Sequence, residues 1–307
     1  MLKVTVMFGR FNELPGGDQA QSIDLARMAD DAGLYGLALG EHVALGMRLD
    51  NYPYAGGLRN PEGSKAHYIE PAVALAAFAA VTSRIRLSTC ILLAPLRPAV
   101  LLAKQLASID VMSRGRLEPV FGVGWSLEEY RSLNVDFAAR HQILRDNLAA
   151  CRALWGEQPT TFKSTTVSFE NLCSMPQPIQ KRIPILLGVV ANDRNVSLIA
   201  ELCDGWDCNP QDSRVPEVIR EGTTKLQNAF RAVGRDPKEL IVKAHLPIFW
   251  ENDRIDLERS FEEVGPMLEA GANQFAIQLP VGFGKSLNTT SAVTGFLQDI
   301  ARLAEKY

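Results

Sequence analysis

The chain has 307 residues, of which 47% are hydrophobic and 22% charged, and its formal net charge at pH 7 is -3. This balance is typical of a globular protein with a large core and excludes a disordered chain. A weakly acidic chain offers no long-range attraction to nucleic acids or anionic membrane surfaces, so we expect neither as a partner.

The five cysteines are odd in number and form no C-x-x-C pair. We therefore expect neither a disulfide framework nor a metal site, and reduced thiols favour a cytoplasmic location. A strand-like segment follows Met1 directly, without the apolar region of a signal peptide. The longest apolar stretch, residues 72–81, is shorter than the roughly 20 residues of a membrane span.

Short β-branched or apolar runs alternate with longer helical patterns along the chain, which predicts repeated βα units around a parallel sheet. The predicted strands are 4–8, 36–39, 85–91, 117–122, 183–188, 205–208, 241–249 and 274–279. The predicted helices are 22–32, 71–81, 98–112, 140–155, 195–202, 216–233, 257–270 and 292–305. Eight such units predict an α/β protein made of one (β/α)8 TIM barrel that spans residues 1–307 as a single domain.

Two segments are too long for ordinary connections. Residues 43–68, rich in Gly, Pro, Tyr and Arg, are predicted to form a lid over the active site after strand two. Residues 160–181 carry a β-branched run between polar turns and are predicted to form a small β insertion after the fourth helix.

In a (β/α) barrel the chemistry lies at the carboxyl ends of the strands. Glu41 and His42 follow the second predicted strand, where a carboxylate and an imidazole can hydrogen-bond a heteroaromatic edge and move a proton. A structural carboxylate beside a packing histidine explains the pair equally well. By composition alone, Cys90 and Ile91 in the third strand are a small hydrophobe and its apolar neighbour.

Two further strands are followed by glycines. Gly122 and Gly124 precede Trp125, which predicts a tight turn or a close approach of the backbone to a ligand. Gly188 and Val189 lead through Asn192 and Asp193 into a helix, whose free amides can hold a phosphate although Asp193 can equally cap the helix. The sequence has no H-E-x-x-H, Gly-x-Ser-x-Gly or Walker A pattern, which disfavours the usual hydrolytic and kinase mechanisms.

Taken together, these segments resemble the luciferase-like monooxygenases and their coenzyme F420-dependent relatives. The resemblance rests on the order and spacing of motifs over nearly the whole chain. They lie at residues 26–33, 40–42, 71–87, 96–107, 113–117, 122–125, 154–155, 176–181, 183–188 and 204–206.

The resemblance implies a third strand that ends in a non-prolyl cis peptide, here between Cys90 and Ile91, forming a wall against the coenzyme ring. It also implies catalytic or ring-contacting roles for Glu41 and His42. In the same way, it assigns coenzyme contacts to Gly122, Gly124, Trp125, Gly188, Val189 and Asn192. Two departures are notable: valines follow Gly188 where many relatives have a second glycine, and Trp125 replaces a glutamate found in one sugar-phosphate dehydrogenase type.

The function implied is hydride transfer between a deazaflavin, F420, and a small organic substrate. The alternative is an FMN-dependent monooxygenase that uses reduced flavin and O2, and a third is a flavin-binding protein without turnover. The resemblance is compatible with a flavin or F420 reductase as a partner and with a homodimer. It implies no metal.

Overall fold

The computed structural model describes residues 1–9, 14, 18–46, 65–252, 254–280 and 287–307. Its main sheet is parallel and has the strand order β3-β2-β1-β13-β10-β9-β8-β5-β4. The strands are β1 (Val4–Phe8), β2 (Gly36–Leu39), β3 (Arg86–Thr89), β4 (Leu92–Leu93), β5 (Val120–Gly122), β8 (Leu186–Gly188), β9 (Gly205–Asp207), β10 (Ile241–Leu246) and β13 (Gln274–Gln278).

The sheet closes into a barrel, and the predicted (β/α)8 fold is confirmed. β3 and β4 are the two halves of the predicted third strand, separated by Cys90 and Ile91. A parallel bridge between Leu87 and Leu117 joins the β3 edge to the chain that enters β5. The carboxyl ends of all the strands therefore open at one mouth.

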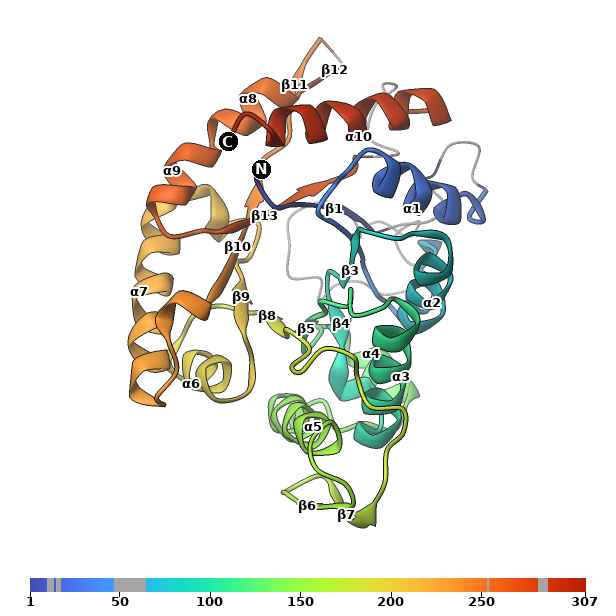
Figure 1. Ribbon diagram of the computed structural model, residues 1–307, viewed down its shortest axis with the longest axis vertical. Coiled ribbons are helices and arrows are strands. Elements are labelled where there is room, and N and C mark those ends of the chain that lie inside the picture. The colour runs from blue at the N-terminus through green and yellow to red at the C-terminus, as the bar shows by residue number, and fades with distance from the viewer. Residues whose placement is uncertain (10–13, 15–17, 47–64, 253, 281–286) are drawn as a thin grey trace.

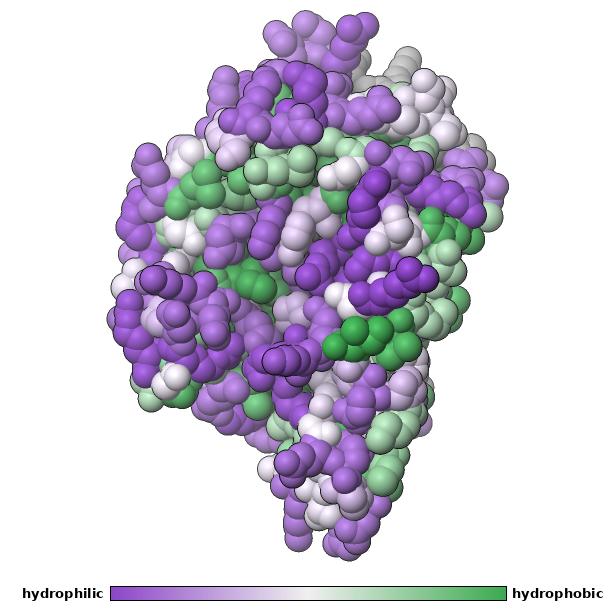
Figure 2. All heavy atoms as spheres, viewed as in Figure 1, coloured by the Kyte–Doolittle hydropathy of each residue, from purple (hydrophilic) through white to green (hydrophobic). Residues whose placement is uncertain are grey.

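Helices surround the sheet in a ring (Figure 1). They are α1 (Gln21–Asp31), α2 (Pro71–Val81), α3 (Ala99–Met112), α4 (Leu127–Ser132), α5 (Arg140–Leu154), α6 (Asp193–Leu202), α7 (Pro216–Ala232), α8 (Leu257–Glu262), α9 (Val264–Glu269) and α10 (Thr290–Ala304). Among the described residues, none of these helices is long and apolar enough to cross a membrane. The outer face in Figure 2 is largely hydrophilic, with apolar residues in separate patches.

Proline explains several differences from the predicted boundaries. The predicted helix 257–270 is broken at Glu263, because Pro266 has no N–H to continue the hydrogen-bond ladder. The predicted strand 241–249 ends at Leu246, before Pro247, and residues 249–256 form a hairpin of β11 (Phe249–Glu251) and β12 (Arg254–Asp256) that the sequence analysis missed. Helix α4 was missed as well.

The β insertion is confirmed, whereas most of the predicted lid lies outside the described residues. β6 (Thr160–Lys163) and β7 (Ser168–Leu172) pair antiparallel and project beyond α5 (Figure 1). Phe162 and Phe169 stack across this hairpin with ring centroids 5.6 Å apart. Residues 47–64 of the predicted lid 43–68 lie outside the described residues.

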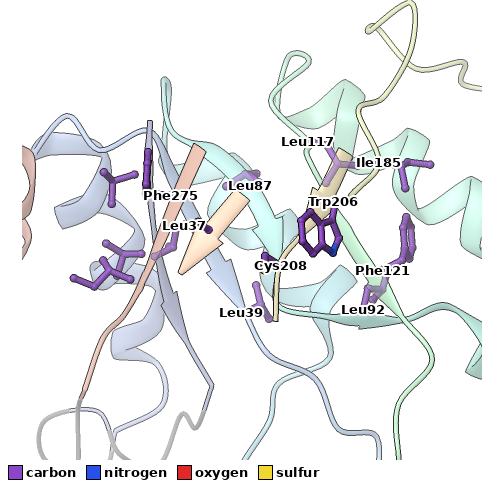
Figure 3. Packing of buried hydrophobic residues seen from close by; sticks show 14 of the residues in the cluster. Leu37, Leu39, Leu87, Leu92, Leu117, Phe121, Ile185, Trp206, Cys208 and Phe275 are labelled. Carbon is purple, nitrogen blue, oxygen red and sulfur yellow. The ribbon is translucent and has the colours of Figure 1, made fainter. Parts of the chain in front are cut away.

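The apolar core lies between the sheet and the helices. Side chains such as Leu37, Leu87 and Phe121 point outward from their strands into this layer (Figure 3). Alternate residues point into the barrel, and there the lining includes buried charges: Lys243 Nζ lies 3.2 Å from Glu118 Oε1. The Tyr35 hydroxyl donates to Glu118 at 2.8 Å.

Trp206 anchors the core beneath α7. Its fully buried indole donates from Nε1 to the Val189 carbonyl at 2.7 Å and packs against Gly222 of α7. A methyl group at Gly222 would lie 2.6 Å from two carbons of the indole ring. The glycine therefore sets how closely α7 approaches β9.

We predict opposite effects of glycine-to-alanine substitution in two helices. Gly222→Ala should lower the free energy of unfolding by about 1–3 kcal/mol, because the overpacked indole must move. Gly295→Ala in α10 meets open space and should raise it by about 0.5–1 kcal/mol through helix propensity. Urea unfolding of both variants checks this, and equal effects would contradict the packing argument.

Asp204 joins three arginines at the amino-terminal end of β9. Its carboxylate accepts from Arg152 at 2.6 Å, from Arg182 at 2.5 Å and from Arg235 at 3.0 Å. The backbone N–H of Ile185 donates to it as well, at 2.9 Å. Burial alone would raise the pKa of the Asp204 carboxyl, but the arginines and this N–H outweigh burial and hold the pKa below its usual value of 3.8.

Asp204→Asn should lower the free energy of unfolding by about 3 kcal/mol at pH 7, because three partly buried guanidinium groups lose their anion. A depressed folded pKa contributes stability above the ordinary pKa and loses it as the pH falls through the folded value. The difference from the wild type should therefore shrink as the pH is lowered from about 7 towards 3. Asp299→Asn, at an exposed aspartate of α10, is the control and should change little.

Candidate active site

The third barrel strand is interrupted by a wall of two residues. The peptide bond between Cys90 and Ile91 is cis, as predicted. The Ile91 side chain lies over Gly188 and Gly122: a methyl group at Gly188 would lie 2.7 Å from Ile91 Cγ2, and one at Gly122 would overlap Ile91 Cδ1. Both glycines end their strands, so the absence of side chains there lets Ile91 reach across the mouth.

Cys90 contributes surface to this wall. It packs against Met7, Ala38 and Ala276, the apolar residues inside the barrel on the adjoining strands. Burial, together with the charge of Asp207, raises the pKa of the Cys90 thiol to about 12. The thiol is therefore protonated at neutral pH and cannot act as a thiolate nucleophile.

His42 is held by a carboxylate from a distant part of the chain. Its Nδ1 lies 2.9 Å from Glu129 Oε2, and the exposed fractions of the two side chains are 11% and 1%. The other oxygen, Glu129 Oε1, accepts from the backbone N–H of Val43 at 2.7 Å and of Ala44 at 3.4 Å. A carboxylate can only accept, so Nδ1 carries the hydrogen and Nε2 is the nitrogen left for other chemistry.

Two aromatic rings flank this imidazole. The Tyr68 ring meets it edge-on with centroids 4.9 Å apart, and the Trp125 ring does so at 5.4 Å. Tyr68 closes the segment of the predicted lid, and Trp125 follows β5. The structure therefore brings together His42 and Trp125, which the sequence analysis had treated as separate candidates.

Glu129 is the main residue of this site that the sequence analysis missed. It lies on α4, where Ser126 caps the helix by accepting from the Glu129 N–H at 3.4 Å. Ser126 followed three residues later by Glu129 is the capping-box pattern, so a signal for the helix was present. The pattern could not show that the carboxylate turns towards His42.

Glu41 lies away from the imidazole that follows it in sequence. Its side chain is 1% exposed and pairs with Arg97 at 2.5 Å. The Leu93 N–H donates to the same carboxylate at 2.6 Å, and Arg97 also binds Glu70 at 2.7 Å. Burial alone would lower the pKa of Arg97, but the two glutamates outweigh it and raise the pKa, so the guanidinium stays charged. Glu41 thus ties the turn after β2 to the chain after β4.

The remaining candidates line the loops after β5 and β8. Gly124 adopts a φ of +70° beside Leu93, which explains a glycine at that turn. The Val189 carbonyl is bound by Trp206. Asn192, not Asp193, caps α6: its side chain accepts from the Asn195 N–H at 3.0 Å. The first turn of α6 follows the loop that the sequence analysis had assigned to a phosphate.

A planar heteroaromatic ring fits this mouth. Ile91 supplies a flat apolar wall over two glycines, and the edges of Tyr68, His42 and Trp125 gather in the loops above the strands. Helix α6 offers its amino terminus for an anionic group. Within the part of the chain that the structure describes, no three His, Cys, Asp or Glu side chains are placed to hold a metal ion.

Comparison with models of protein families shows the family of this chain. The model of the luciferase-like monooxygenases matches residues 4–306. The chain belongs to this family. The predicted resemblance is thereby confirmed, as is the prediction of an oxidoreductase enzyme that works with a flavin or F420.

Two relatives differ in how much of each protein is similar to this chain. The uncharacterised protein Rv0953c of Mycobacterium tuberculosis is 33% identical over 218 residues, which is 71% of this chain and 76% of the relative. The pyrimidine monooxygenase RutA of Allorhizobium ampelinum is 27% identical over 191 residues, 59% of this chain and 50% of RutA. The match with RutA thus spans half of that protein.

Solved structures share the fold at low identity. The monooxygenase RslO1 of Streptomyces bottropensis superimposes with a TM-score of 0.71 at 19% identity, covering 97% of this chain and 98% of RslO1. An F420-dependent secondary alcohol dehydrogenase, solved with an F420-acetone adduct, gives 0.72 at 14% identity and 99% coverage of both chains. The oxygenating component of the 3,6-diketocamphane monooxygenase of Pseudomonas putida, solved with FMN, gives 0.71 at 13% identity and covers 100% of this chain and 99% of its own.

Proposed function

We propose that this chain transfers a hydride between F420 and a small organic substrate, with His42 moving the accompanying proton. The observation that carries the proposal is the His42–Glu129 pair at the barrel mouth, flanked by Tyr68 and Trp125. When bound, the deazaflavin supplies or accepts the hydride at a ring carbon. Reduction of a carbonyl to an alcohol needs one proton at oxygen as well, and the reverse reaction removes it.

The coenzyme ring would rest on Cys90 and Ile91, with Gly122 and Gly188 beneath the wall. Gly124 and Trp125 would lie at its edge, and Val189 and Asn192 would line the path of its phosphate chain to α6. Glu41 supports this arrangement from behind as a positioning residue, because its carboxylate is committed to Arg97 and Leu93.

Glu129 prepares His42 for proton transfer. It fixes the tautomer, which directs Nε2 rather than Nδ1 to the substrate, and it stabilises the imidazolium that forms when Nε2 takes a proton. Tyr68 and Trp125 restrict the rotation of the ring and keep water from it. The imidazole is therefore held in one orientation at the barrel mouth.

The second candidate is an FMN-dependent monooxygenase that receives reduced flavin from a reductase. The similarity to RutA favours it. The same wall and the same imidazole serve that chemistry too. Residues 47–64 of the predicted lid lie outside the described residues.

Purified protein should bind F420 more tightly than FMN in parallel fluorescence titrations. This expectation comes from the sequence, in which Leu96-Arg97-Pro98 resembles the F420-dependent relatives more than the FMN-dependent ones. Measurable FMN binding at micromolar concentration with no F420 binding would overturn the proposal in favour of the monooxygenase. Binding of one coenzyme without any change of its redox state, over a panel of alcohols and ketones, would indicate a binding protein.

His42→Ala should lower the single-turnover rate of coenzyme reduction about 100-fold or more, because a positioned acid or base is lost. The free energy of unfolding should change little, since Glu129 keeps its two backbone partners. Glu129→Gln should give a smaller loss of rate, because the amide oxygen can still accept from Nδ1 but carries no charge for the imidazolium.

Glu128→Gln is the matched control: it removes the adjacent carboxylate of the same helix, which does not contact His42. Its rate should equal that of the wild type. A destabilised His42→Ala protein with a normal rate per folded molecule would show that His42 serves packing and would remove it from the mechanism.

A further inference from the structure

Inward-facing side chains near the carboxyl ends of the strands form a floor just inside the barrel mouth. Inward-facing residues near the strand ends include Met7, Ala38, Cys90 and Ala276, which pack together, and His245, which is in register with Ala276. Met7 and Ala38 are in register, and so are Gly188 and Asp207. In-register residues of parallel neighbours point to the same side, so Asp207 points inward beside the glycine that Ile91 covers. Lys243, in register with Asp207 on the next strand, faces inward as well.

Asp207 and His245 hold one another. His245 Nε2 lies 2.6 Å from Asp207 Oδ1, and both residues are 4% exposed. The backbone N–H of His245 donates to the buried Ser213 hydroxyl at 3.0 Å. A carboxylate can only accept, so Nε2 carries the hydrogen. The imidazole is thus fixed in position and in tautomer.

The other nitrogen of this ring has no partner. His245 Nδ1 is buried and makes no hydrogen bond to any of the residues that the structure describes. Buried polar atoms of native proteins are nearly always paired, and an exception asks for an explanation such as a bound group. The site described above makes no use of His245 or Asp207.

The pair adjoins the coenzyme wall and not the loops above it. Asp207 and Lys243, which are in register on β9 and β10, are the two charges that act on the Cys90 thiol. The pair therefore lies at the level of Cys90 and of the glycines under Ile91. His42, Trp125 and Tyr68 belong to the loops that follow the strands, where the substrate would enter.

We propose that His245, oriented by Asp207, is a hydrogen-bond anchor for the polar edge of the heteroaromatic ring that rests on this floor. The inference rests on the proposed function, in which that ring belongs to the coenzyme. The pyrimidine edge of flavins and deazaflavins carries an N–H between two carbonyl groups. Neutral Nδ1 accepts from the former, and protonated Nδ1 donates to one of the latter. His245 binds the ring, and Asp207 is a positioning residue.

Coenzyme titration and histidine NMR test this together. The sequence has four histidines, so protein labelled with 15N-histidine gives few ring signals, and the His245→Gln variant assigns the one of interest. Addition of F420 or FMN to the wild type should shift the His245 Nδ1 resonance. His245→Leu should weaken binding of the coenzyme by roughly tenfold or more, and His245→Gln, whose amide can still hydrogen-bond, should recover part of the loss.

Two further variants separate anchoring from folding. Val242→Ala truncates a buried residue of the same strand that points outward to the helices, and it should bind the coenzyme as the wild type does. Asp207→Asn replaces the carboxylate by an amide, which can either accept from Nε2–H or donate to Nε2, so the charge is lost and the imidazole is no longer held in one tautomer. It should change both the Nδ1 resonance and the affinity while His245 itself is retained.

The outcomes are distinct. If the wild type binds a coenzyme but the His245 Nδ1 resonance does not move and His245→Leu binds equally well, the anchor is overturned while the proposed function stands. If the wild type binds neither coenzyme, the proposed function fails and the anchor falls with it. If His245→Leu does not fold, the response of the wild-type Nδ1 resonance decides alone.

Discussion

Closure of an all-parallel sheet is the constraint on which the site depends. Parallel strands that form a closed barrel deliver every carboxyl end to one mouth, and side chains alternate between the helices outside and the lumen inside. The outer set is apolar and forms the main core (Figure 3). The inner set is free to carry charge, and the buried Lys243–Glu118 ion pair shows that it does.

The carboxylates at the two ends of the barrel have different roles. Asp204 with its arginines lies at the amino-terminal side, where carboxylates join helices to strands and serve stability. At the carboxyl-terminal side the carboxylates Glu41 and Glu129 instead fix loops. Glu41 immobilises the chain beyond the Cys90–Ile91 wall, and Glu129 immobilises the imidazole of His42.

Membership of the luciferase-like family shows the barrel and the class of oxidoreductase but leaves the coenzyme and the reaction to local features. Members with this barrel include F420-dependent and FMN-dependent enzymes, and both superimpose on the chain equally well. What distinguishes one reaction from another is therefore a small number of side chains at the mouth. Two imidazoles, His42 held by Glu129 and His245 held by Asp207, can hold a proton at a defined nitrogen.

The amino-acid sequence by itself determined the barrel, because each of the eight βα units shows its buried strand and its amphipathic helix within a short stretch of the chain. It also placed His42, Trp125 and the Cys90–Ile91 bond at strand ends, through motifs that are contiguous in the chain. The break at Glu263 and the early end of β10 depended on single prolines within otherwise regular patterns.

Only the tertiary structure showed which side chains hydrogen-bond to the candidate histidines. Glu129 and His42 are 87 residues apart, and Asp207 and His245 are 38 apart. Hydrophobic periodicity in the sequence cannot reveal a hydrogen bond between residues so far apart. Each residue on its own is compatible with an ordinary helix cap or strand. Glu41 shows the converse: adjacent to His42 in sequence, it turns to Arg97, because successive residues at a strand end point in different directions.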